Sequence, residues 1–127
     1  MIWIAVLVGG ALGSAARHAV NISTARLLDD PGPFATATVN MIGSLAIGVL
    51  AGLLAVHRLT MSTTMRTFVF VGVIGGFTTF SSFMLDSLTL LEAGAPGRAL
   101  MNLLGQIVVG SVLVYAGFRV GLAWTSH

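Results

Sequence analysis

The segment GGFTTFSSF, which runs from Gly75 to Phe83, decides how this chain folds. It lies inside an apolar stretch, residues 67–91, that is long enough to cross a membrane as a helix. Its two glycines, three phenylalanines and four hydroxyl residues are poor material for a lipid-facing helix. The part before Gly76 spans only about 13 Å of a hydrocarbon core of about 30 Å. We therefore predict that the third helix is broken at Gly75-Gly76 and that a second half-helix begins near Phe80.

The hydroxyl groups of this segment are suited to capping the second half-helix, because Ser and Thr are preferred at helix N-termini. Non-helical backbone at mid-membrane is stable only where it is buried in protein or lines a cavity. Free carbonyl groups around residues 75–78 would suit a small cation, whereas free amide groups around residues 80–83 would suit an anion. A kink repaired by hydroxyl side chains is the alternative. The four hydroxyl residues are Thr78, Thr79, Ser81 and Ser82.

The composition is that of a membrane protein. Hydrophobic residues make up 56% of the 127 residues and charged residues only 8%, whereas soluble domains have about 25% charged residues. The absence of cysteine excludes disulfides and thiolate metal sites. The net charge of +2 comes from scattered arginines rather than a basic patch, so nucleic-acid binding is not expected. The first apolar stretch is interpreted as a retained span, not a cleaved signal peptide.

Four apolar stretches, each about the length of a membrane span, follow one another with short polar connections. They predict a single four-helix membrane domain over residues 1–127. Four pairs of glycines, each spaced four residues apart, predict that the helices pack closely. The predicted spans are approximately 2–28, 34–56, 67–91 and 99–124, and the glycine pairs are Gly9/Gly13, Gly48/Gly52, Gly72/Gly76 and Gly117/Gly121.

The arginines give almost no preference for one orientation in the membrane. Four spans place Arg58, Arg66 and Arg119 on one side, and Arg26 and Arg98 on the other. Because basic residues in short loops orient a helix bundle, a bias of three against two is weak. We hypothesise that the chain inserts both ways and forms an antiparallel homodimer. A single orientation is an equally acceptable interpretation of this count.

Polar residues inside the spans indicate either interhelical hydrogen bonds or an aqueous path. Asn40 belongs to a polar stripe on the second span, and Asn102 and Gln106 share a face of the fourth. Arg17 is the cation that lies deepest within a span, and Asp86 could pair with an arginine. The stripe on the second span consists of Thr36, Asn40 and Ser44.

Phe80 and Phe83 are three residues apart and are expected to point the same way. Core packing is the ordinary role of such rings. The positive edge of an aromatic ring can also face an anion, and the amide of Asn40 could donate two hydrogen bonds to it. Thr79, Ser81 and Ser82 would add hydroxyl donors, and Arg17 would concentrate anions at the mouth.

Catalytic and metal-binding patterns are absent from the sequence. No nucleophile, base and orienting residue form a recognisable set, so an enzyme is not expected. The three histidines, His18, His57 and His127, have no metal-ligand spacing.

Three motifs resemble the Fluc-type fluoride channels of bacteria, the CrcB family: GGALGSAAR (residues 9–17), NMIGS (residues 40–44) and GGFTTFSSF (residues 75–83). The resemblance implies passive fluoride export across the bacterial inner membrane by an antiparallel, dual-topology homodimer with two pores. It also implies that Phe80 and Phe83 line the fluoride path, and that a structural Na⁺ lies at the dimer centre, where we assign it to the carbonyl groups of Gly75 and Thr78. Asn102 and Gln106 occupy positions where members of the family carry different polar residues. We predict that these two residues line the fluoride path on the fourth span.

Two other classes remain as alternatives. A small multidrug exporter also has four spans, but it depends on a carboxylate in the first span, where this chain has Arg17 and no acid before Asp29. A membrane assembly subunit without transport activity would explain the glycine pairs but not the polar stripes.

Overall fold

The computed structural model describes residues 1–28 and 32–124, so the predictions that concern Asp29, Asp30 and His127 lie outside the described residues. The described part is helical, and its four long apolar segments are each able to span a membrane, as predicted. The elements are α1 (Ile2–Leu27), α2 (Phe34–Ala55), α3 (Thr63–Arg66), the π-helix η1 (Thr67–Ile74), α4 (Gly75–Phe77), α5 (Phe80–Glu92) and α6 (Pro96–Ala123).

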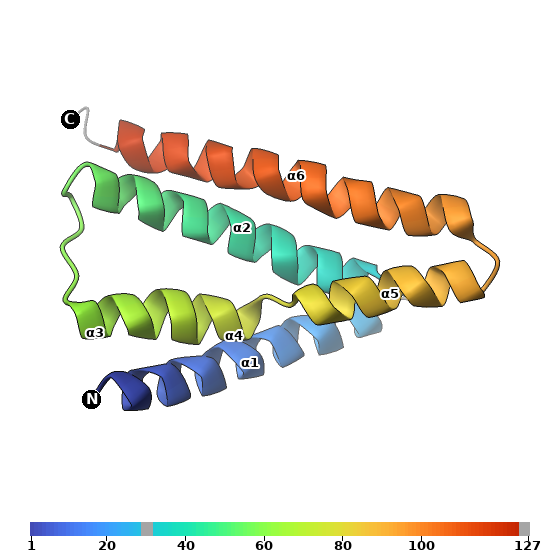
Figure 1. Ribbon diagram of the computed structural model, residues 1–127, viewed down its shortest axis with the longest axis horizontal. Helices are drawn as coiled ribbons and strands as arrows, with labels where there is room; N and C mark the ends of the chain where they lie inside the picture. The colour runs from blue at the N-terminus through green and yellow to red at the C-terminus, as the bar shows by residue number, and fades with distance from the viewer. Residues whose placement is uncertain (29–31, 125–127) are drawn as a thin grey trace.

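The helices pack as two pairs. α2 lies along α6, and α1 lies along η1 and α4 (Figure 1). α5 continues the third span on the other side of the interruption and packs against α6. α2 and η1 diverge toward the loop of residues 57–66, as Figure 1 shows. The first half of the third span therefore packs against α1, and its second half packs against α6.

Glycines allow the close contacts within both pairs. A Cβ atom at Gly117 would lie 2.5 Å from the carbonyl oxygen of Leu45, and one at Gly9 would lie 2.6 Å from that of Phe68. Real Cβ atoms do not approach backbone this closely, so any side chain there would push the helices apart. The prediction of close packing from the glycine spacing is confirmed for all four pairs.

The backbone of the third span leaves the helical conformation at Thr78 and Thr79, not at the glycines. Thr78 has φ −80° and ψ 160°, and Thr79 has φ −151° and ψ 115°. The predicted break at Gly75-Gly76 is therefore wrong, because both glycines are helical. The role of Gly76 is packing, since a Cβ atom there would lie 2.7 Å from the carbonyl oxygen of Gly10.

The start of α5 agrees with the sequence. The helix begins at Phe80, and Thr79 is its N-cap residue. The Thr79 hydroxyl accepts a hydrogen bond of 3.2 Å from the backbone N–H of Ser82. The prediction of a hydroxyl-capped helix from near Phe80 is confirmed, because Thr79 satisfies one of the amide groups that the helix start leaves free.

Candidate functional site

Asn40 clamps the extended backbone of the third span. Its Oδ1 accepts a hydrogen bond of 2.9 Å from the backbone N–H of Thr79, and its Nδ2 donates one of 3.1 Å to the carbonyl oxygen of the same residue. Both backbone groups of Thr79 therefore have partners although the residue is not helical. An unpaired backbone group inside a membrane costs several kcal/mol, roughly, so this clamp makes the interruption tolerable.

A chain of side-chain hydrogen bonds continues from Asn40 across three helices. Asn40 Nδ2 donates to Gln106 Oε1, Gln106 Nε2 donates to Asn102 Oδ1, and each bond is 2.9 Å long. Asn102 Nδ2 then donates to Ser87 Oγ at 2.9 Å, and Ser87 Oγ donates to the carbonyl oxygen of Phe83 at 2.9 Å. We call Asn40, Gln106, Asn102 and Ser87 the amide chain. It joins α2, α6 and α5 beside the interruption.

The amide chain has a fixed direction. A backbone N–H can only donate, so the N–H of Thr79 determines which end of the Asn40 amide is the oxygen. The nitrogen of Asn40 must then face Gln106, and each following amide is oriented in turn. The oxygens of Asn40, Gln106 and Asn102 are consequently all engaged.

The donors left over differ from those expected. We predicted that Asn40 would offer two N–H groups to an anion, but its nitrogen already donates to both Thr79 and Gln106. An anion at Asn40 would have to replace one of these bonds. Gln106 and Asn102 each use one N–H within the chain, which leaves each a second N–H without a hydrogen-bond partner among the described residues.

The predicted hydroxyl residues gather at the start of α5. Thr79 Oγ1 donates to Ser82 Oγ at 3.0 Å and lies 3.5 Å from Ser81 Oγ. Because Ser82 Oγ accepts from Thr79, its own proton remains available to another acceptor. These three hydroxyls form one cluster beside the interruption.

Phe80 and Phe83 are brought together in an edge-to-face arrangement. Their ring centroids are 5.9 Å apart and their planes are inclined by 69°. Both rings line a cavity of 300 Å³ together with Asn40, Ser44 and Thr79, which we call the phenylalanine cavity. Phe83 is 4% exposed, whereas Phe80 is 72% exposed. This chain therefore covers only one of the two rings.

A second cavity, of 290 Å³, lies where α2, α5 and α6 meet, and three polar residues of α6 line it. Arg98, Asn102 and Gln106 are spaced four residues apart and so share one face of α6. We call it the Arg98 cavity. Its other walls include the apolar side chains of Phe34, Met101 and Val109.

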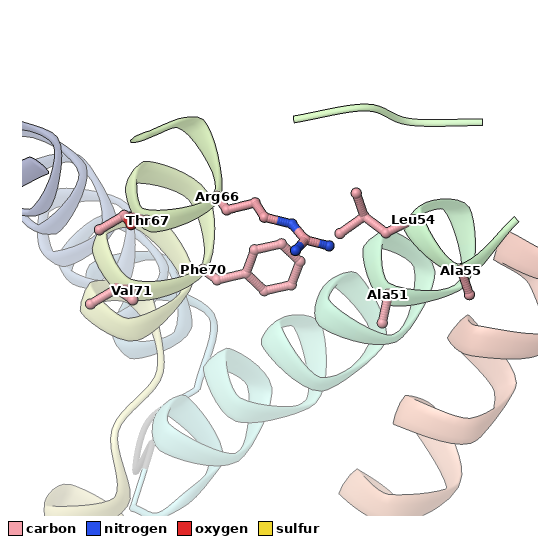
Figure 2. Close-up of a pocket in the computed structure, with 7 residues that line it drawn as sticks. All are labelled: Ala51, Leu54, Ala55, Arg66, Thr67, Phe70 and Val71. Carbon is pink, nitrogen blue, oxygen red and sulfur yellow. The ribbon is translucent and has the colours of Figure 1, made fainter. Parts of the chain in front are cut away.

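The largest of these cavities, 560 Å³, is lined by none of the predicted site residues. Figure 2 shows the side chain of Arg66 extending from the third span past the ring of Phe70 toward Leu54 on α2. Thr67 and apolar residues form the rest of its lining. It contains no side-chain amide, so the polar path suggested by Asn40 and Gln106 does not pass through it.

Arg17 and Asp86 lie apart from these groups. Arg17 is half-buried on α1, one turn beyond Gly13, and lines none of the three cavities. Asp86 does not form the ion pair that the sequence allowed with an arginine of the described residues, and its Oδ2 is buried without a hydrogen-bond partner there. The structure thus separates Arg17 from the phenylalanine cavity.

Gly75 begins the short helix α4, and Thr78 is the first extended residue after it. Gly75 is exposed, and a Cβ atom there would make only an ordinary contact of 3.5 Å with the carbonyl oxygen of Phe70. Thr78 is half-buried, and its hydroxyl donates to the carbonyl oxygen of Ile74 at 2.9 Å. The described residues contain no cluster of three or more His, Asp or Glu side chains able to hold a metal.

Two residues of these sites were missed in the sequence. Ser87 is buried between Asn102 and Phe83, and its position four residues after Phe83 was the available signal. Arg98 was counted only for topology, although it continues the four-residue spacing of Asn102 and Gln106. In both cases the four-residue spacing could be seen in the sequence, but which helix packs beside these residues could not.

Comparison with known proteins gives consistent matches over nearly the whole chain. Residues 4–118 match the model of the family described as CrcB-like protein, Camphor Resistance (CrcB). A protein of Paracoccus denitrificans named fluoride-specific ion channel FluC is 48% identical over 120 residues, which cover 94% of this chain and 93% of that protein. Proteins with the same name from Agrobacterium fabrum and Methylobacillus flagellatus are 46% and 47% identical, and cover 91% and 90% of this chain and 92% and 89% of their own lengths.

Proposed function

The chain belongs to the CrcB family, and from this premise we propose that it is a fluoride-selective channel that exports fluoride passively across the bacterial inner membrane. The relatives are ion channels, and the chain is a multi-pass membrane protein and not an enzyme. The observation that carries the proposal is the name shared by relatives that are 46–48% identical over at least 90% of the chain. The clamped, interrupted third span supports a membrane path, since such backbone is typical of ion routes.

We propose further that two copies assemble as an antiparallel homodimer with two pores. The exposure of Phe80 and Gly75 on either side of the interruption supports this assembly, because one chain leaves the middle of its third span uncovered. The non-helical residues Thr78 and Thr79 are themselves only half-buried. Irregular backbone facing lipid is unfavourable, so a protein surface is expected to cover it. The near-equal arginine count on the two sides permits both orientations.

In this proposal, fluoride passes the edges of Phe80 and Phe83 in the phenylalanine cavity. Ser82, which is hydrogen-bonded to Thr79, and Gln106, which is hydrogen-bonded to Asn40, each keep a donor without a partner among the described residues, while Thr79 and Ser81 complete the hydroxyl cluster. Several weak, spaced contacts suit conduction, because an ion must bind firmly enough to enter and loosely enough to leave. Asn40 acts mainly by holding Thr79 in place, and Arg17 raises the anion concentration at a vestibule.

Fluoride efflux from liposomes, measured with a fluoride electrode, tests the function. We expect efflux that follows the fluoride gradient, needs no proton gradient and exceeds chloride efflux by a large factor. A proton-coupled multidrug exporter would instead move organic cations against a gradient. An assembly subunit would leave fluoride flux at the level of protein-free liposomes.

Phe80→Ile and Phe83→Ile are each expected to reduce fluoride flux sharply, by an order of magnitude or more, roughly a barrier increase of 1.4 kcal/mol or above. Isoleucine keeps an apolar side chain but removes the positive ring edge that faces the anion. Efflux assays of assembled protein measure the effect, and Phe68→Ile on η1 is the matched control outside the phenylalanine cavity. If both variants assembled and conducted like the parent, the rings would serve packing alone.

A structural Na⁺ is proposed at the carbonyl groups of Gly75 and Thr78. One chain offers it two carbonyl oxygens there, so the fit depends on a second antiparallel copy that contributes its own pair. Hard oxygen ligands suit Na⁺, and the ion would offset the repulsion between clustered carbonyl dipoles. These residues would hold the ion, which would supply cohesion between the subunits rather than any step of transport.

Replacement of Na⁺ by a large organic cation is therefore expected to weaken the dimer and to abolish most transport. Size-exclusion chromatography at nanomolar protein concentration and efflux assays measure the two effects. K⁺ at the same ionic strength separates a specific site from a general salt effect. Indifference of both dimer and flux to the organic cation would remove the site.

A further inference from the structure

We propose that the Arg98 cavity is a mouth of the fluoride path, in which Arg98 gathers the anion and passes it to Asn102 and Gln106. This inference rests on the proposed function. It adds an entrance that the sequence did not indicate, since Arg17 was the expected vestibule residue. The entrance lies at the beginning of α6, away from the loop of residues 57–66 (Figure 1).

The direction of the amide chain determines which ion this cavity accepts. Asn102 Oδ1 already accepts from Gln106, and Gln106 Oε1 already accepts from Asn40. Both residues keep one N–H that has no partner among the described residues. The polar side chains of the cavity therefore present two unpaired N–H donors and a guanidinium group, while each amide oxygen already accepts one hydrogen bond. Such a lining favours a small anion.

Arg98 is available to attract that anion. Among the described residues, no acidic side chain forms an ion pair with Arg98 and none lines the cavity. Arg98 is exposed, and the apolar side chains beside it in the cavity, among them Phe34 and Val109, give its guanidinium group no acceptor to pair with. A mouth that carries charge of one sign raises the local concentration of the oppositely charged ion by roughly tenfold or more.

Gln106 connects this mouth to the phenylalanine cavity. It is only 9% exposed, it lines the Arg98 cavity, and it is hydrogen-bonded to Asn40, which lines the phenylalanine cavity. Arg98 lies eight residues before Gln106 on one face of α6, a rise of about 12 Å. Asn102 lies midway and its free N–H can take the anion between the two. Arg98, Asn102 and Gln106 thus offer the anion three successive contacts along α6, toward the phenylalanine cavity.

The test compares Arg98→Gln with the parent protein in fluoride efflux from liposomes at two ionic strengths. At about 0.01 M salt the Debye length is about 30 Å, and at about 1 M it is about 3 Å. Arg98→Gln is expected to lower flux at least about threefold at low ionic strength, and the difference is expected to vanish at high ionic strength. Arg98→Lys should recover most of the lost flux, because it restores the charge.

Arg119→Gln is the matched control, since Arg119 lies near the other end of α6 and contacts Tyr115 rather than the cavity. Parent-like flux of Arg98→Gln at low ionic strength would overturn the inference. So would a loss that is equal at both ionic strengths or that Lys does not reverse, because such a loss is structural. A parent protein without fluoride flux would refute the proposed function itself, and this inference with it.

Discussion

Asn40→Asp is expected to abolish fluoride flux, to the level of liposomes without protein. The substitution replaces the nitrogen that donates to Thr79 and Gln106 by a second oxygen. The carbonyl oxygen of Thr79 and Oε1 of Gln106 would then face a carboxylate instead of a donor. Each buried acceptor left without a donor costs about 1–3 kcal/mol. The added negative charge would also repel the anion from the phenylalanine cavity, which Asn40 lines. Both effects act against conduction.

The control and the readouts separate these two effects. Thr38→Ala removes an exposed polar side chain two residues earlier on α2 and should leave flux and assembly unchanged. Thermal melting in detergent reports the loss of the clamp, while fluoride efflux from the assembled fraction reports the electrostatic block. Asn40→Asp protein that assembles and keeps more than about half of the parent flux would contradict the assigned role of Asn40.

Fixing one orientation in the membrane is expected to abolish transport completely, and mixing two opposite orientations should restore it. Thr60→Lys with Met61→Lys raises the number of basic residues on the side of the 57–66 loop from three to five, while the other side keeps two. Positive charge in short loops orients the bundle, so this variant should insert one way only. It then lacks the inverted partner that an antiparallel dimer needs. Efflux assays after purification measure the loss.

The opposite variant supplies the rescue. Arg58→Gln with Glu92→Lys and Ala93→Lys leaves two basic residues on the side of the 57–66 loop and gives the other side four. This variant should also be inactive alone. Co-expression of the two variants should return flux toward that of the parent. Thr60→Gln with Met61→Gln alters the same loop without charge and is the control. Parent-like transport by either charged variant alone would remove the antiparallel dimer from the proposal.

Much of the candidate site was predictable because its residues are close in sequence. The capping of α5 by Thr79 depends on residues three positions apart, and the pairing of Phe80 with Phe83 depends on one helical turn. Such local relations follow from helix geometry alone. The engagement of the Asn40 nitrogen was not predictable, because both of its acceptors come from other helices. The roles of Ser87 and Arg98 were not predictable either, because they too depend on residues of other helices.

The amino-acid sequence by itself determined the four apolar helices and their close packing. Membrane insertion depends on hydrophobicity summed along a segment, and glycines four residues apart necessarily share a helix face. Neither property needs knowledge of a neighbouring helix.

Only the tertiary structure decided where the third span is interrupted and which donors remain free. Helical backbone gives way where another group can replace its hydrogen bonds, and the amide of Asn40 does so at Thr79, 39 residues away in sequence. Gly75 and Gly76 stay helical although glycine is a poor helix former, and the close contact of Gly76 with Gly10 of α1 leaves no room for a side chain there. The site therefore depends on long-range hydrogen bonds and on the space between helices, which local sequence does not encode.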